Sequence, residues 1–374
     1  MKKIIILLAS FTVFGCTPYE IIEEPAASGP APFELSGRGL AAMFASLPMG
    51  PEQLHEVHAA VSLSSGNGYD EEYTLDSLLL RPGAGVGPGT KAQPSGTPLR
   101  EMIRDYLEIH AATRSGIDDI MELLAESGYQ LYWPYSEDWD GVSYPVITYD
   151  PGYGAESNYG YELAPGPDGA VIVDTLIVDE AMAQTRPVWV VNSNSDAAFT
   201  PLELFTGAEN SPATTSSRPR RLMLKSFKMM RNYDSWFGGA SEFFLKVGSV
   251  EGFSASTDEE LKLYSPSITD FMIVVKRRDI DKEMAYEAIM VSDFSTQLDK
   301  IAFLIVEDDG GTRTGWKCEA AVKIQSKSYG ISLDIPYNEK DDIVWRGQLS
   351  ARFFEEEDIV TGRFGDVVCS FELE

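Results

Sequence analysis

The spacing of hydrophobic positions changes near the middle of the chain. In the first half, apolar side chains recur every three or four positions in three segments, which predicts amphipathic helices. These segments are residues 51–65, 98–112 and 117–124. Short runs rich in aromatic and β-branched residues predict strands at residues 129–135, 144–149, 170–178 and 188–191. The first half is therefore expected to form a mixed α and β domain over residues 37–206.

From residue 221 onward the pattern is that of strands. Apolar runs, which suit strands buried on both faces, occur at residues 243–247, where Lys246 interrupts the run, and at residues 271–275 and 301–306. Alternation of core-facing and outward-facing positions follows at residues 345–353 and 367–373. About eight strands separated by turn residues predict an antiparallel β-sandwich over residues 221–374. The expected fold class is therefore α+β, with a mixed α/β N-terminal domain followed by an all-β antiparallel sandwich.

Two segments carry too few apolar residues to contribute to a core. Residues 207–220 are rich in Ser, Thr and Pro, which predicts a linker between the two domains. Residues 16–36 contain several Pro, Ala, Ser and Gly, a composition typical of a flexible tether.

The N-terminus has the features of a secretion signal. Lys2 and Lys3 precede an apolar stretch over residues 4–14, which is too short to span a bilayer. The end of this stretch and the two residues after it, Val13, Phe14, Gly15 and Cys16, resemble the lipobox of bacterial lipoproteins.

This resemblance implies that residues 1–15 are a signal peptide and that Cys16 becomes a lipidated N-terminus. The chain would then be held by its lipid to a membrane of the bacterial cell envelope, and the outer membrane is the membrane we expect. Two or more acyl chains make a durable anchor. The alternative is an ordinary secretion signal that happens to end at a cysteine.

Charge narrows the classes of partner. The chain has 58 acidic and 30 basic side chains and a net charge of −28. Such a surface repels phosphate backbones, which argues against nucleic-acid binding, and it attracts divalent cations and cationic partners. No segment after the signal is long and apolar enough to span a membrane.

Residues 129–161 interleave ten aromatic side chains with carboxylates. Flat rings stack on the apolar faces of sugars while acids accept hydrogen bonds from hydroxyl groups. The residues expected to bind a ligand in this way are Trp133, Tyr135, Trp139, Asp138 and Asp140. The alternative is that these rings belong to the core. The predicted function is a non-catalytic binding or assembly module for a glycan or an envelope protein.

A hydrolase that uses the N-terminal domain is the rival hypothesis. Glu137, Asp138 and Asp140 could supply the two carboxylates of a glycosidase. His55 and His58 would share one face of a helix, as two metal ligands do. Neither the HExxH spacing of metalloproteases nor a GxSxG nucleophile motif is present.

Acidic residues also gather at two strand ends of the predicted sandwich. Glu307, Asp308 and Asp309 follow the strand at residues 301–306, and Asp341 and Asp342 precede the strand that begins at Val344. This arrangement is similar to that of C2-type sandwiches, in which aspartates from neighbouring end loops share calcium. The likeness implies a calcium site formed by Asp308, Asp309, Asp341 and Asp342, provided that both clusters lie at the same end. The alternative is that these acids solvate turns.

Cys318 and Cys369 are the cysteines that remain after lipidation. Strand alternation points both of them into the sandwich core. In an oxidising compartment they could form a disulfide, or they could pack as two buried free thiols.

Overall fold

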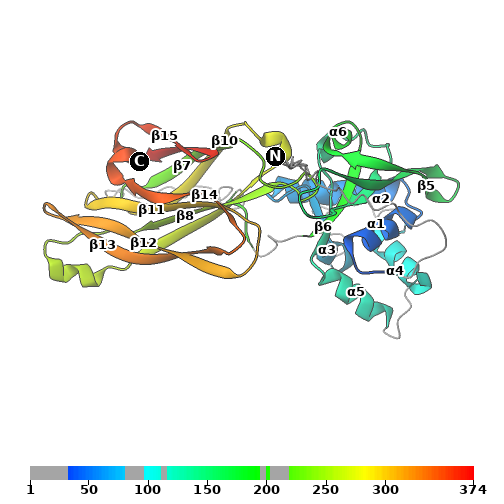
Figure 1. The fold of residues 1–374 in the computed structure, drawn as a ribbon, viewed down its shortest axis with the longest axis horizontal. Coiled ribbons are helices and arrows are strands. Elements are labelled where there is room, and N and C mark those ends of the chain that lie inside the picture. The colour runs from blue at the N-terminus through cyan, green and yellow to red at the C-terminus, as the bar shows by residue number, and fades with distance from the viewer. Residues whose placement is uncertain (1–32, 81–96, 111–115, 194–198, 203–218) are drawn as a thin grey trace, which may run out of the picture.

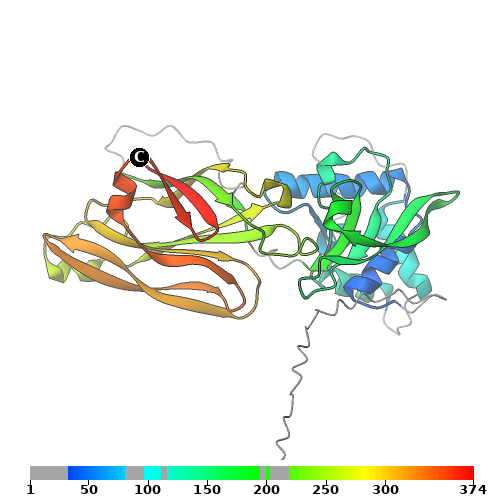
Figure 2. The ribbon, with the colours of Figure 1, turned by 45° about the horizontal axis from the view of Figure 1, so that its top comes forward.

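The computed structural model describes residues 33–80, 97–110, 116–193, 199–202 and 219–374. The signal peptide, Cys16, most of the predicted tether and residues 207–218 of the predicted linker lie outside the described residues. An N-terminal region (residues 33–202) and a C-terminal region (residues 219–374) lie end to end along the long axis of the molecule (Figures 1 and 2). None of the helices in the described ranges is long and apolar enough to cross a membrane.

The N-terminal region combines helices with a six-stranded sheet in the order β1-β2-β6-β3-β4-β5. Its helices are α1 Gly37–Ser46, α2 Pro51–Gly66, α3 Leu75–Leu80, α4 Leu99–His110, α5 Ile117–Ala125 and α6 Glu180–Ala183. Its strands are β1 Glu72–Thr74, β2 Tyr129–Tyr132, β3 Val146–Tyr149, β4 Ser157–Gly166, β5 Gly169–Asp179 and β6 Val188–Ser193. Only β3 and β6 pair in parallel, and the other neighbours are antiparallel. The sheet is therefore mixed, and the predicted α+β class is confirmed.

Strand β6, near the centre of this sheet, is covered on both faces. Trp189 and Val191 pack with the helices in one core, while Val188 and Val190 point to the opposite face. On that opposite face they meet Trp236 and Phe237, which come from the C-terminal region and are fully buried. A strand that is buried on both faces has no polar side to show, which explains its continuous apolar run.

The C-terminal region consists of two antiparallel sheets around one core. Its strands are β7 Leu222–Met229, β8 Ser241–Ser249, β9 Ser267–Val275, β10 Met284–Val291, β11 Leu298–Glu307, β12 Arg313–Ile324, β13 Lys327–Asn338, β14 Asp342–Ser350, β15 Ile359–Phe364 and β16 Val367–Leu373. Short 3-10 helices lie at η2 Asp258–Leu263, η3 Arg277–Asp279 and η4 Ala351–Glu355. One sheet has the order β10-β7-β16-β15 and the other β13-β12-β11-β8-β9, with β14 also pairing with β11. Apolar side chains from both sheets form the core, as the sandwich prediction requires.

The connection between β7 and β8, hereafter the 230–240 loop, inserts into the N-terminal region. The Trp236 indole donates a hydrogen bond of 3.0 Å from Nε1 to the carbonyl of Glu156. Asn192 on β6 donates from Nδ2 to the carbonyls of Phe237 and Gly238, at 3.0 and 2.7 Å. The backbone N–H of this loop's last residue donates to buried Asp70 at 2.9 Å. The two regions therefore share apolar core and buried hydrogen bonds.

The disulfide that the sequence leaves open is not formed, because Cys318 and Cys369 are both free thiols. Cys318 lies on β12 and Cys369 on β16, which belong to different sheets. Cys318 is half-buried and Cys369 is fully buried, so both contribute to the core as predicted. Burial raises the pKa of both thiols, to about 11 for Cys318, which keeps them protonated and unreactive at neutral pH.

Candidate ligand pocket and carboxylate cluster

A pocket of about 240 Å³ opens between the 133–143 segment and the turn that leads from α6 into β6. All five residues predicted to bind a ligand line it, namely Trp133, Tyr135, Trp139, Asp138 and Asp140. The opposite wall is formed by residues 183–187. The structure therefore gathers the predicted residues at one place, although they are spread over both a strand end and a loop.

Indole rings form the aromatic part of this pocket. Trp133 is 1% exposed and lies at the buried end, with its ring centroid 5.2 Å from that of Trp139. Trp139 is partly exposed and is supported from behind by His55 and His58, whose ring centroids lie 4.9 and 5.1 Å away. The two histidines thus support an indole, and within the described residues neither belongs to a metal-ligating group. Trp139 and Tyr135 are the partly exposed aromatic side chains that line this pocket, and Trp139 is the partly exposed indole.

A buried carboxylate holds the turn that carries these residues. Glu71 accepts hydrogen bonds from the backbone N–H groups of Tyr135 and Ser136, at 3.2 and 2.9 Å, and from the Ser136 hydroxyl at 2.9 Å. Tyr135 has a left-handed backbone with φ 58°, which a non-glycine residue adopts only when its surroundings enforce it. Burial, together with the neighbouring Glu137 carboxylate, raises the pKa of Glu71 to about 8. Glu71 does not line the pocket, so its role there is to position the turn.

The two predicted aspartates of the pocket have different roles. Asp140 accepts hydrogen bonds from Val142 N–H, Ser143 N–H and the Ser143 hydroxyl. These bonds hold the turn and lower the pKa of the Asp140 carboxyl. Asp138 forms an ion pair with Arg278 of the C-terminal region at 3.2 Å, and its side chain is still 71% exposed. Asp138 is therefore the aspartate at the rim that remains open to a ligand.

A second hollow of about 330 Å³ adjoins the pocket and shares Ser143, Arg186 and Pro187 with it. Its remaining wall is formed by residues 142, 144 and 163–165. Arg186 lies between the two hollows and is held by Glu162, with an N–O distance of 2.7 Å. The two hollows adjoin and make one groove. The first is smaller than most known ligand pockets, which measure about 300–1,000 Å³, and the second is at the lower end of that range.

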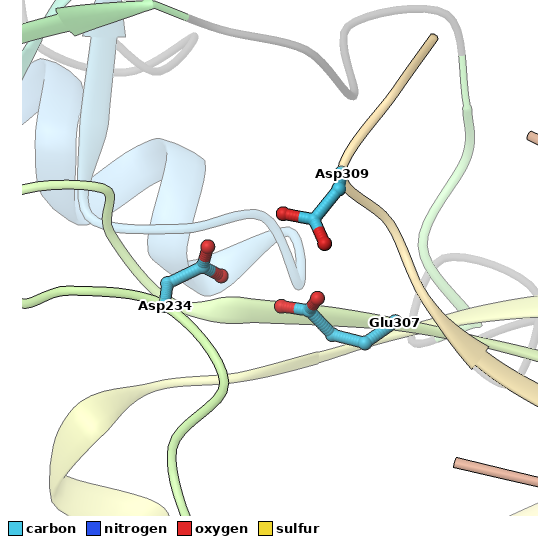
Figure 3. Close-up of side chains that lie close together, drawn as sticks. All are labelled: Asp234, Glu307 and Asp309. Atoms are coloured by element: carbon cyan, nitrogen blue, oxygen red, sulfur yellow. The ribbon is translucent and has the colours of Figure 1, made fainter. Parts of the chain in front are cut away.

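Three carboxylates converge where the 230–240 loop meets the end of β11. Asp234 lies in that loop, Glu307 is the last residue of β11, and Asp309 lies two residues further on. One oxygen of each carboxylate lies within 4.8 Å of the others. Figure 3 shows the three side chains pointing toward one another from two separate segments. In the described part of the chain, no other group of His, Cys, Asp or Glu side chains converges in this way.

Glu307 is the buried member of this cluster. It is 1% exposed, and neither of its carboxylate oxygens has a hydrogen-bond donor. Among the described residues, no Lys or Arg forms an ion pair with any of the three carboxylates. Burial and the nearby Asp234 raise the pKa of Glu307 to about 11, and the same two causes raise that of Asp309 to about 6. At neutral pH the cluster therefore holds a proton or a cation.

The other predicted calcium ligands lie nearby. Residues 307 and 342 face each other across β11 and β14, so both acid clusters are at the same end of the sandwich, as the calcium hypothesis requires. Asp308 and Asp341 are buried and both bind Asn338, through its side-chain amide at 3.0 Å and its backbone N–H at 2.7 Å. Asp342 is exposed, and its charge raises the pKa of Glu307. Of the four predicted ligands, Asp309 is the one whose carboxylate converges with those of Asp234 and Glu307.

The groove and the cluster differ in what they can do chemically. The groove offers an indole face and hydrogen-bonding groups, which suit a polar, uncharged ligand. The cluster offers only hard oxygen atoms, which suit a cation. Comparison of the chain with family models, with curated proteins and with solved structures finds no match in any of the three.

Proposed function

We propose that this protein is an envelope lipoprotein, anchored through Cys16, that acts by binding and takes a glycan into the groove beside Trp139. The observation that carries the proposal is that five residues with sugar-binding chemistry line one pocket. Indole rings stack on the apolar face of a pyranose, and carboxylate, amide and hydroxyl groups meet its hydroxyl groups.

The polar groups of the groove lie on both sides of the indole. Asp138 is at one rim, and Gln184, Thr185 and Arg186 form the opposite wall. Because the groove continues past Arg186 into the second hollow, it has room for more than one sugar ring. The ligand class that fits best is therefore an oligosaccharide bound along the groove.

Hydrolysis has less support from the same residues. Glu137 and Asp138 are both ion-paired with Arg278, and Asp140 is occupied by the hydrogen bonds of its turn. A general acid needs a pKa near the working pH. Glu71 has such a pKa but is buried outside the groove. Of the three acids, Asp138 is the one left open to a ligand, so the groove lacks the pair of carboxylates that a glycosidase needs.

Glycan-array retention of the mature protein, followed by calorimetric titration with the retained oligosaccharide, tests the proposal. Trp139→Ala should abolish retention, because it removes the exposed indole of the groove. Asp138→Asn should weaken binding about 10-fold to 150-fold, the equivalent of one hydrogen bond to a charged group. The matched control is Tyr153→Ala, which removes a fully exposed ring of the same aromatic-rich segment outside the groove.

Circular dichroism of each variant shows whether it is folded. If folded Trp139→Ala and Asp138→Asn bind the oligosaccharide as the native protein does, the groove is not the binding site. If no glycan is retained by any form, and an envelope protein co-purifies with the lipidated chain, the assembly role replaces the glycan role.

A further inference from the structure

We propose that Asp234, Glu307 and Asp309 bind a calcium ion, and that this ion fastens the 230–240 loop to the end of β11. The site is independent of the groove, and its ligands come from two segments that are more than seventy residues apart in the chain. It differs from the site predicted from the sequence in two of its three ligands.

Glu307 is a buried carboxylate whose oxygens have no hydrogen-bond partner. A buried carboxylate is normally satisfied by donors or by a positive partner, because burial of an uncompensated charge is costly. Glu307 is 1% exposed, has no donor on either oxygen, and points toward two more carboxylates (Figure 3). A cation at the centre of the three would compensate all of them at once.

The donor set selects the type of cation. The three ligands are all carboxylate oxygens, whereas zinc and copper favour sites with His or Cys. Oxygens bound to one calcium ion at about 2.4 Å can be at most about 4.8 Å apart. The oxygens of the three residues lie within 4.8 Å of one another. Asp309 is exposed, so water can complete the coordination from that side, and calcium, which accepts irregular sets of oxygens, fits better than magnesium.

The position of Asp234 links the proposed site to the contact between the two regions. Asp234 lies two residues before Trp236, whose indole is buried in the N-terminal region. The carbonyl of Asp234 also accepts a hydrogen bond from Arg277, which is itself paired with Glu180 of the N-terminal region. A calcium ion shared by Asp234 and Glu307 therefore fixes the inserted loop relative to the sandwich. Binding should stabilise the contact between the two regions.

The test uses the mature protein, stripped with a chelator and then titrated with calcium chloride from micromolar to millimolar concentrations. The thermal midpoint should rise by about 2–4 °C or more, and above the dissociation constant it should go on rising with the logarithm of the calcium concentration. Hydrogen exchange in residues 230–240 should slow over the same concentration range. Sodium chloride of equal ionic strength should reproduce neither effect, because a salt that only screens charge does not bridge the three carboxylates.

Asp234→Asn with Asp309→Asn should fold, since it removes two mutually repelling charges, and should lose both responses to calcium. The matched control, Glu356→Gln with Asp358→Asn, neutralises two acids of an exposed run outside the cluster and should keep both responses. The proposal is overturned by no calcium response in the native protein or by an equal response in the Asp234/Asp309 variant. A midpoint shift without slower exchange in residues 230–240 would also overturn it, by placing the ion elsewhere.

Discussion

Replacing Trp236 with alanine tests how strongly the inserted loop joins the two regions. The side chain is fully buried against β2, β3 and β6, and its Nε1 donates to the Glu156 carbonyl at 3.0 Å. Removing a buried Trp or Phe side chain to alanine costs about 3–5 kcal/mol. A domain has only about 5–15 kcal/mol of stability in total, so this loss is a large part of it. We expect the N-terminal region to lose its attachment and to unfold at a lower urea concentration.

Two probes separate the regions in a urea titration. All six α-helices of the described residues lie in the N-terminal region, so circular dichroism at 222 nm follows that region. Cys369 is fully buried in the C-terminal core, so its alkylation follows unfolding of that region. The two signals should change together in the native protein. In Trp236→Ala the helical signal should be lost first.

Trp316→Ala is the control, because Trp316 is a partly buried indole that packs only in the C-terminal core. In Trp316→Ala, the helical signal at 222 nm should be lost no earlier than Cys369 becomes open to alkylation. The reasoning is refuted if Trp236→Ala lowers the free energy of unfolding by less than about 1 kcal/mol, or if its two transitions still coincide.

Two further predictions concern the anchor and a buried acid. Cys16→Ala should move the protein from the detergent phase to the aqueous phase in a phase-partition assay, and a variant that stays with detergent would contradict lipidation at this residue. The pKa of Glu71 is raised to about 8 in the folded state, so from about pH 5 to 8 the folded chain holds a proton that the unfolded chain lacks, and stability falls as the pH rises. Glu71→Gln should reduce this dependence by up to about 1.4 kcal/mol per pH unit in urea titrations across that range, and an unchanged slope would contradict the shift.

Local pattern was sufficient for the elements whose apolar residues repeat with one clear period. The helices α2, α4 and α5 and the buried strands β8, β9 and β11 coincide with the predicted segments. Helix α1 was missed because it begins with two glycines and is too densely apolar to show a polar face. Strand β4 was missed because it contains glycine, proline and asparagine, which are depleted in strands.

Of the two candidate sites, the pocket could be predicted from the sequence and the full carboxylate cluster could not. The pocket could be predicted because its aromatic residues come from one short segment, so their proximity follows from chain connectivity. Asp234 could not be assigned to the carboxylate cluster, because it is separated from Glu307 by three strands and no local pattern marks it. The different roles of Asp138 and Asp140 depend on hydrogen bonds of a turn, which composition does not reveal. An isolated Trp-Phe pair in a loop was the available signal for the inserted segment.

The insertion of Trp236 and Phe237 also sets the order in which the chain can mature. The β6 face that they cover lies in residues 188–193, so this part of the N-terminal core stays open while the chain is made only to that point. A ribosome or a translocation channel delivers residues in sequence. Val188 and Val190 therefore stay uncovered on this face until more than forty further residues, up to Trp236 and Phe237, have been made. A chaperone bound to this apolar face of the nascent N-terminal region would have to dissociate after β7 has emerged, so that Trp236 and Phe237 can pack there.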